Sequence, residues 1–124
     1  MESVLDAIER LDPKTSRAVR FVIVFGSVAR GEATWKSDVD LLVLLADGEE
    51  RARLAVERAL ADPALPLRHG VSPIFAGVDE FLRARRALFD DVRESGVVVR
   101  GDVDQAGPDV MVWRSLRRYA STST

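Results

Sequence analysis

The sequence predicts an α/β fold in which helices flank a β-sheet. Short apolar runs rich in β-branched residues, such as 22–25 and 41–45, are bounded by turn residues, which is typical of buried strands. Segments with apolar residues at helical spacing, such as 49–61, alternate with these runs. The chain has 124 residues, enough for one domain with its own core.

The order of the elements follows from turn residues and from the period of the apolar positions. In chain order we expect a helix ended by Asp12-Pro13, a strand within 17–25, a short helix within 27–31, a strand over 38–46, a helix over 49–61, a strand over 70–75, a helix over 79–90, a strand at 97–99 and a terminal helix over 110–119. Because proline cannot donate to a neighbouring strand, Pro73 places the third strand at an edge or a bulge. We divide the chain into a domain over 1–104 and a linker with a helical tail over 105–124.

Composition narrows the possible functions. The chain has 18 basic and 20 acidic residues and a net charge of −2, which argues against a general nucleic-acid-binding surface. The absence of cysteine excludes disulfides and thiolate metal sites and fits a reducing compartment. No apolar run approaches the roughly 18–20 residues of a membrane span, and the acidic N-terminus is unlike a signal peptide. We therefore expect a cytoplasmic protein.

Two carboxylates precede the second expected strand. Side chains alternate along a strand, so Asp38 and Asp40 point to the same side, about 7 Å apart along the chain, while Val39 faces the other way. Two such carboxylates repel each other, and a cation between them removes that cost. Oxygen ligands suit Mg²⁺. We interpret the pair as part of a magnesium site rather than as a solvated turn.

A glycine and a serine end the first expected strand. Gly26 has no Cβ, so a phosphate can approach the backbone, and Ser27 adds a hydroxyl donor. If 27–30 open a helix, its first amides form an anion site. A triphosphate at this turn, with Mg²⁺ between it and the carboxylates, is the arrangement that nucleotidyl transfer requires.

Gly26-Ser27, ten intervening residues and Asp38-x-Asp40 on an apolar strand together resemble the signature of the DNA polymerase β-like nucleotidyltransferase superfamily. The segments 29–32 and 37–40 are similar to its minimal, MNT-type branch. The resemblance implies a mixed sheet, Mg²⁺ on Asp38 and Asp40, nucleotide phosphates on Gly26 and Ser27, and ATP as the default donor.

Two further residues are candidates for nucleotide binding, each with a structural alternative. Arg30 could contact a phosphate, or it could serve only the C-terminal end of the short helix. Ser37 could orient Asp38 or simply cap the turn before it. The sequence leaves both alternatives open.

Basic residues in the second half of the chain have two interpretations as well. Arg83, Arg85 and Arg86 form a cluster that is usually a solvated helix face, with nucleic-acid binding as the alternative. A second group could dock on a partner chain or lie on the parent domain: Trp113, Arg114, Arg117, Arg118 and Tyr119. Nothing local decides between these possibilities.

One departure from the family pattern affects activity. Competent members usually carry a third acidic residue on a later strand, where it binds a metal or deprotonates the attacking hydroxyl. Here no carboxylate lies between Asp62 and Asp79, and Ser72 stands about where the missing acid would align. Losing a general base commonly lowers a rate by about 10²–10⁴-fold. Whether the chain is an active enzyme is therefore open, although the resemblance favours an adenylyltransferase.

The resemblance implies a specific acceptor. Short MNT proteins are similar to antitoxins that transfer AMP from ATP to a tyrosine hydroxyl of a HEPN-domain ribonuclease toxin. Such a partner would suit a chain with no obvious acceptor-binding domain. One alternative is a weak or inactive nucleotidyltransferase fold that neutralises its partner by binding. Another is transfer to a small molecule, against which the short length counts.

Overall fold

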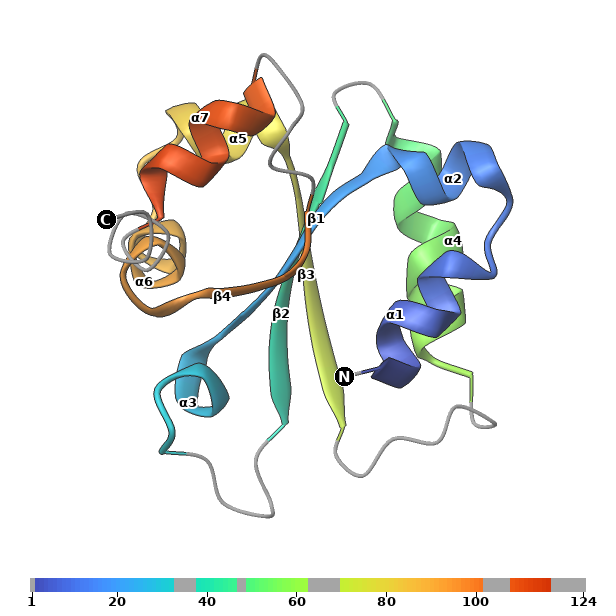
Figure 1. The fold of residues 1–124 in the computed structure, drawn as a ribbon, viewed down its shortest axis with the longest axis horizontal. Helices are drawn as coiled ribbons and strands as arrows, with labels where there is room; N and C mark the ends of the chain where they lie inside the picture. Colours follow the sequence, from blue (N-terminus) through green and yellow to red (C-terminus); the bar gives the residue numbers. More distant parts are fainter. Residues whose placement is uncertain (1, 33–37, 47–48, 63–69, 102–107, 117–124) are drawn as a thin grey trace.

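The protein folds into a four-stranded mixed β-sheet between two layers of helices (Figure 1). The computed structural model describes residues 2–32, 38–46, 49–62, 70–101 and 108–116. The strands are β1 (Val19–Phe25), β2 (Val39–Leu45), β3 (Val71–Gly77) and β4 (Val97–Arg100). They lie in the order β3-β2-β1-β4, with β1 antiparallel to both β2 and β4 and with β2 parallel to β3. The mixed sheet that the resemblance implied is confirmed.

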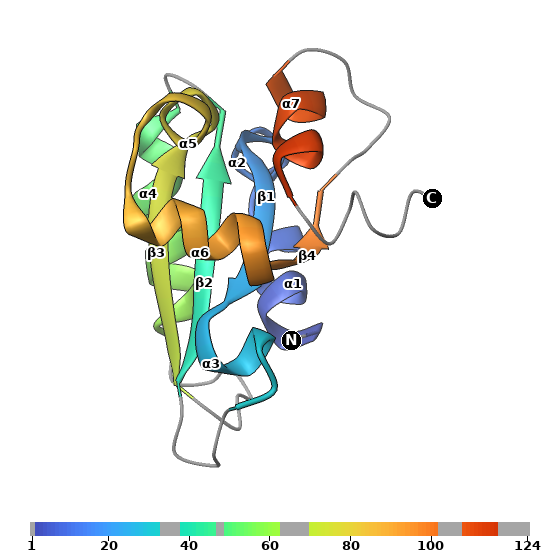
Figure 2. The ribbon, with the colours of Figure 1, turned by 90° about the vertical axis from the view of Figure 1, so that its left-hand side faces the viewer.

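Helices cover both faces of this sheet. One face carries α1 (Glu2–Glu9), α2 (Pro13–Ala18) and α4 (Glu50–Leu60), and the other carries α5 (Val78–Arg83), α6 (Ala87–Ser95) and α7 (Pro108–Ser115) (Figures 1 and 2). A short helix, α3 (Gly26–Ala29), follows β1 directly. Because β1 and β2 are central strands covered on both sides, their sequences are nearly continuous apolar runs. No helix in the described ranges is long and apolar enough to cross a bilayer.

The core consists of two clusters, one on each face of the sheet. Leu41 and Val43 of β2 belong to the cluster shared with α1 and α4, whereas Leu42 and Leu44 belong to the cluster shared with α5, α6 and α7. This period of two fixes the direction of every side chain on β2. Asp40, two residues before Leu42, therefore faces the side of the sheet that α5, α6 and α7 cover.

The turn at Asp12-Pro13 does more than end the first helix, which the sequence predicted. It also begins α2, which the sequence analysis missed and assigned in part to the first strand. Asp12 is the N-cap, accepting from the Thr15 amide at 3.1 Å, and Pro13 occupies the first turn, where its missing N–H has no intrahelical partner to lose.

The single helix expected over 79–90 was wrong, because the chain forms α5 and α6 with an extended connection at 84–86. In a continuous helix, Phe81 and Phe89 would lie about 12 Å apart along the axis. The bend instead brings their rings edge to face, with centroids 5.2 Å apart. Arg93 stabilises the bend by donating to the Phe81 carbonyl and stacking 4.6 Å from the Phe81 ring. Burial of both rings explains the break.

The edge position expected for Pro73 is confirmed, since β3 lies at one edge of the sheet.

The expected terminal helix is present as α7, although residues 117–119 of that prediction lie outside the described residues. Val112 and Leu116 of α7 are buried in the same cluster as Phe21. The rings of Trp113 and Phe21 pack edge to face, with their centroids 5.7 Å apart. Trp113 therefore packs on the parent domain.

Candidate functional site

The end of β1 and the start of β2 meet at one end of the sheet. Phe25 pairs with Asp40 across the two strands, so the turn after Phe25 lies directly beside the Asp40 carboxylate. Gly26 in that turn has a φ of +75°, a conformation that favours glycine. A Cβ placed on Gly26 would lie 2.5 Å from Oδ2 of Asp40. The glycine is needed here for its backbone conformation and for the close approach of the carboxylate.

The second carboxylate lies at the start of the neighbouring strand. The Val39 amide donates to the Gly70 carbonyl at 2.8 Å, which holds the entry to β2 against the entry to β3. A Cβ on Gly70 would lie 2.5 Å from Oδ1 of Asp38. Asp38 is exposed and Asp40 is half-buried. In this structure Asp40 approaches the β1 side, while Asp38 approaches the β3 side.

Both carboxylates face the same side of the sheet. Asp40 pairs with Ser72 and Val39 with Val71 in the parallel β2–β3 register, and residues opposite each other on neighbouring strands share a face. Extending that register by one residue places Asp38 beside Gly70, as their close contact requires. Ser72 is therefore the β3 residue next to Asp40, which is the position where the sequence suggested a missing acid.

Arg30 follows α3 and forms ion pairs in this structure. Its Nε lies 3.2 Å from Glu32 Oε2, and its Nη1 lies 3.2 Å from Asp91 Oδ1. The hydrogen bond that Arg30 donates to Glu32, together with the negative charges of Glu32 and Asp91, raises the pKa of Arg30 above its usual value. The side chains of Arg30 and Asp91 are 40% and 39% exposed. Arg30 thus connects α3 to α6, and phosphate binding by it stays a prediction.

The remaining nucleotide-binding candidates differ in how they are placed. Ser27 is half-buried in α3, immediately after Gly26. Ser37 lies outside the described residues. Sequence reasoning missed Gly70 and Asp91. A glycine at the start of an expected strand was the available signal for Gly70, whereas nothing local indicated that Asp91 would contact Arg30.

The donor set fits a hard cation better than a soft or cysteine-bound one. Two carboxylates and the hydroxyls of Ser27 and Ser72 are oxygen donors, the type that Mg²⁺ prefers. The Asp40 carboxylate occupies the position beside the backbone where a Cβ on residue 26 would stand, so one of these oxygen donors lies directly against the turn. Among the described residues no group of three or more histidine, cysteine, aspartate or glutamate side chains could hold a metal. A cation here would therefore depend on two carboxylates and on the oxygens of its substrate.

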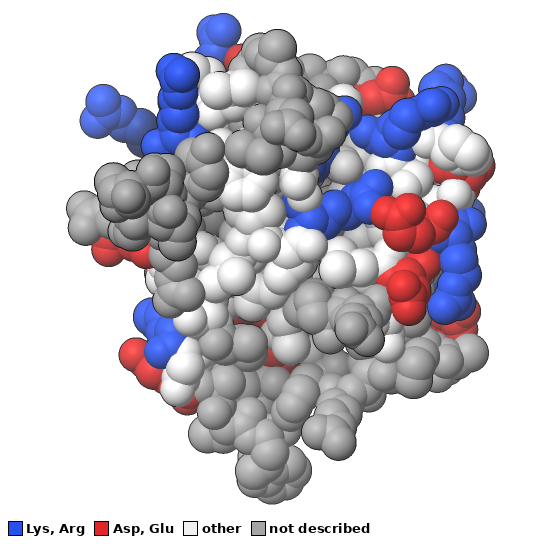
Figure 3. All heavy atoms as spheres, viewed as in Figure 1, with Lys and Arg blue, Asp and Glu red and all other residues white. Residues whose placement is uncertain are grey.

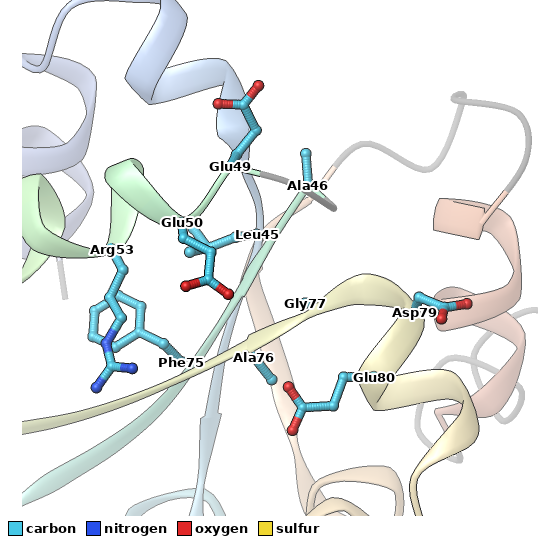
Figure 4. Close-up of a pocket in the computed structure, with 10 residues that line it drawn as sticks. All are labelled: Leu45, Ala46, Glu49, Glu50, Arg53, Phe75, Ala76, Gly77, Asp79 and Glu80. Carbon is cyan, nitrogen blue, oxygen red and sulfur yellow. The ribbon is translucent and has the colours of Figure 1, made fainter.

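A cavity of about 500 Å³ lies at the other end of β2 and β3 (Figure 4). Its lining includes Leu45, which is about 16 Å along the strand from Asp40. Carboxylates such as Glu50 and Glu80 surround it, and Arg53 stacks on the Phe75 ring at 5.5 Å. Figure 4 shows Glu49 pointing away from the cavity. This cavity is therefore separate from the end of the sheet that carries Asp40 and the turn at Gly26.

Comparison with known proteins identifies a family and structures with a similar fold. The family model described as a nucleotidyltransferase domain matches residues 1–104. The chain is similar in structure to a toxin–antitoxin solved with AMP-PNP, with a TM-score of 0.58 and 20% identity over 98% of this chain and 88% of that chain. It is also similar to a mutant of the toxin–antitoxin MntA–HpeT, with a TM-score of 0.53 and 18% identity over 98% and 88% of the two chains. These two likenesses show a shared fold.

No curated protein matches the chain in a sequence comparison. The family match spans most of the chain, including both carboxylates and the glycine-serine turn. The chain belongs to the nucleotidyltransferase domain family.

Proposed function

We propose that the protein is a magnesium-dependent adenylyltransferase that transfers AMP from ATP to a hydroxyl group of a partner protein. The observation that carries the proposal is the approach of the Gly26 backbone to the Asp40 carboxylate. A Cβ at residue 26 would lie 2.5 Å from Oδ2, so the carboxylate stands directly against the backbone of the turn. Phosphate binding at the turn and cation binding at the carboxylate would then occur side by side.

The chain's own residues would have three roles in this reaction. Asp38 and Asp40 would hold Mg²⁺, which when bound supplies charge stabilisation for the triphosphate. Gly26 would admit a phosphate oxygen close to the backbone, and the Ser27 hydroxyl would donate to it. The acceptor oxygen forms a bond to the α-phosphorus, the bond from that phosphorus to the β-phosphate bridge breaks, and pyrophosphate leaves. The hydroxyl proton passes to solvent or to a nearby base.

We propose a toxin of the HEPN class as the partner, so that the protein acts as an antitoxin. Support comes from the resemblance to the MNT branch and from the fold shared with two toxin–antitoxin structures. One of these structures contains AMP-PNP, which supports ATP as the donor. A cytoplasmic location would give the protein access to both.

A thermal-shift experiment tests the nucleotide site without requiring the partner. Mg²⁺ with ATP should raise the melting temperature, because a ligand that binds only the folded state stabilises it. Asp38→Asn combined with Asp40→Asn should abolish this shift while leaving the unliganded fold intact. As a matched control, Asp79→Asn combined with Glu80→Gln removes two carboxylates beside the distant cavity and should leave the shift unchanged. An unchanged ATP response in the first double variant would contradict the assigned site.

A second function, neutralisation by binding alone, is favoured by one observation. Ser72 occupies the β3 position beside Asp40, and no third metal-binding acid accompanies the pair within the described ranges. Labelled ATP incubated with the protein and a co-purified partner distinguishes the two functions. Covalent AMP on the partner, lost in Asp40→Asn, supports transfer. A tight complex that never acquires label supports binding without turnover.

A further inference from the structure

A basic groove lies on the same face of the sheet as the carboxylates but at the opposite end. It has a volume of about 590 Å³ and runs between the α5–α6 connection and α7. Arg83, Arg85, Arg93 and Arg114 line it, and Asp90 is the one carboxylate among the described lining residues. Figure 3 shows basic side chains gathered over α5 and α7. This concentration of positive charge contrasts with the net charge of −2 of the whole chain.

The four arginines are held to different degrees. Arg93 is fixed by the Phe81 carbonyl and by Asp90 at 3.2 Å, and only 23% of its side chain is exposed. Arg83 pairs with Asp79 at 2.7 Å, one turn earlier on α5. Within the described residues, Arg85 and Arg114 form no ion pair, and both are exposed. Two guanidinium groups on opposite sides of the groove are thus available to a negatively charged ligand.

The groove also offers apolar surface. Met111 of α7 lines it and is 51% exposed, one of two large hydrophobic residues exposed to this degree among the described residues. Arginine and methionine are both enriched at protein–protein interfaces. Among the described residues that line it, none has an aromatic side chain on which a nucleobase could stack. This combination fits an acidic protein segment with apolar residues better than it fits a nucleic acid.

The charge of the segment 117–124 does not complement this groove. Its side chains include two arginines and no aspartate or glutamate. They would add positive charge to a surface that is already basic. A partner with the opposite charge is therefore the better match.

We propose that this groove, defined by Arg85, Arg93, Met111 and Arg114, docks an acidic amphipathic helix of the partner protein. The inference rests on the proposed function, because the docked protein would be the acceptor of AMP. α6 links the two places: Asp90 and Arg93 line the groove, while Asp91 contacts Arg30 beside the carboxylate site. Figures 1 and 2 show α6 between α7 and α3. A partner held in the groove would lie on the face that carries Asp40.

The experiment uses the full chain and a defined probe. A fluorescein-labelled synthetic helical peptide carries leucines at helical spacing and glutamates elsewhere, and its binding is followed by fluorescence anisotropy. We expect saturable binding that weakens with salt. Arg85→Glu combined with Arg114→Glu should reduce the affinity at least about tenfold, because like charges would then oppose each other. The matched control, Arg51→Glu with Arg58→Glu on α4, reverses the same charge on the other face and should change the affinity little.

Several outcomes would overturn the inference. The unmodified chain could fail to bind the peptide, or the two double variants could lose equal peptide affinity. A single-stranded RNA could bind more tightly than the peptide and depend on the same arginines. The unmodified chain could also form a dimer that the changes at Arg85 and Arg114 dissociate. The ATP-dependent thermal shift separates this proposal from the nucleotide site. If the groove variant keeps that shift and loses the peptide, both proposals stand. If even the unmodified chain shows no ATP-dependent shift, but the peptide binds it and is lost in the groove variant, the nucleotide assignment alone fails.

Discussion

Gly26 and Asp40 approach each other so closely that a single methyl group at residue 26 would lie 2.5 Å from Oδ2 of Asp40. The two residues are brought together by the antiparallel pairing of Phe25 with Asp40. The approach requires two properties of glycine at once, a φ of +75° and the absence of a side chain. Gly31 has nearly the same φ, +73°, but no atom of the described residues lies within 4 Å of its Cβ position, its chain neighbours aside. Comparing alanine variants of the two glycines therefore separates the cost of the left-handed backbone from the cost of the collision with Asp40.

Gly26→Ala should lower the free energy of unfolding by more than Gly31→Ala does. The left-handed conformation costs a non-glycine residue about 1–3 kcal/mol at either position, and only residue 26 adds the collision with Asp40. Chemical denaturation measures the difference. The ATP-dependent thermal shift should be lost in Gly26→Ala and kept in Gly31→Ala. Equal stability losses, with the shift intact in both variants, would show that the close contact has no role.

Ser72→Asp should restore a third acid beside Asp40. The two residues are paired across β2 and β3 and share a face of the sheet. Without Mg²⁺ the added charge should lower the melting temperature, because three carboxylates then repel one another. Saturating Mg²⁺ should reverse that loss, and transfer of label to the acceptor should rise by about 10²-fold or more. Ser72→Asn has a similar size without the charge and should show neither effect.

The central strands were predictable because their physical signal is local. β1 and β2 are buried on both faces, so each appears in the sequence as an apolar run that ends at turn residues. The face of the sheet to which Asp40 points follows from the alternation of side chains along β2. Its approach to Gly26 follows from the antiparallel pairing of β1 with β2. The sequence alone therefore predicts that Asp40 and the turn after β1 lie side by side, whereas their binding of a cation and a phosphate stays a prediction.

Features that depend on contacts distant in sequence were not predictable in the same way. The break between α5 and α6 has no glycine or proline to mark it, and it results from the packing of Phe81 on Phe89. The ion pair of Arg30 with Asp91 joins residues 61 positions apart. The burial of Leu116 against the sheet likewise depends on where the chain returns after β4.

Arg30→Gln and Asp91→Asn should have different effects on ATP binding. If Arg30 binds a phosphate, which is one of the two alternatives that the sequence left open, removing its charge should weaken ATP affinity by about tenfold, the effect of one charge-assisted hydrogen bond. Asp91→Asn removes the competing carboxylate and should leave the affinity equal or higher. Isothermal titration with Mg²⁺–ATP measures both. Equal affinities in the two variants and the unmodified chain would assign Arg30 only to the connection between α3 and α6.

Leu116→Ala should destabilise the whole domain, although residue 116 lies beyond the segment matched by the family model. Leu116 is 2% exposed and packs in the cluster that contains Phe21 and Val112. Truncating a buried leucine typically lowers the free energy of unfolding by about 2–5 kcal/mol. Met111→Ala is the control on the same helix, and because Met111 is 51% exposed, its effect should stay within about 0.5 kcal/mol. Similar small effects in both would indicate that the C-terminal segment is an independent tail.

Asp12→Ala should destabilise the protein at neutral pH by an amount that disappears in acid. The Thr15 hydroxyl donates to Oδ1 of Asp12 at 2.6 Å and its amide donates to Oδ2 at 3.1 Å, and these bonds lower the pKa of Asp12 below its usual value. A carboxyl group whose pKa is lower in the folded state stabilises that state above its unfolded pKa. This contribution begins to be lost as the pH falls below the unfolded-state pKa of about 4, and it is gone once the pH has fallen through the lower pKa of the folded state.

Thermal melts across this pH range should therefore show the unmodified chain and Asp12→Ala converging as the pH falls. Asp6→Ala removes a charge of the same sign from α1 without removing a helix cap. A difference between Asp12→Ala and the unmodified chain that stays constant down to the acid limit would mean that the cap does not depend on the ionised carboxylate. The same result in Asp6→Ala as in Asp12→Ala would indicate an effect of net charge instead. If the melting temperature of Asp12→Ala, but not that of Asp6→Ala, converges with that of the unmodified chain in acid, the two Thr15 hydrogen bonds stabilise the start of α2.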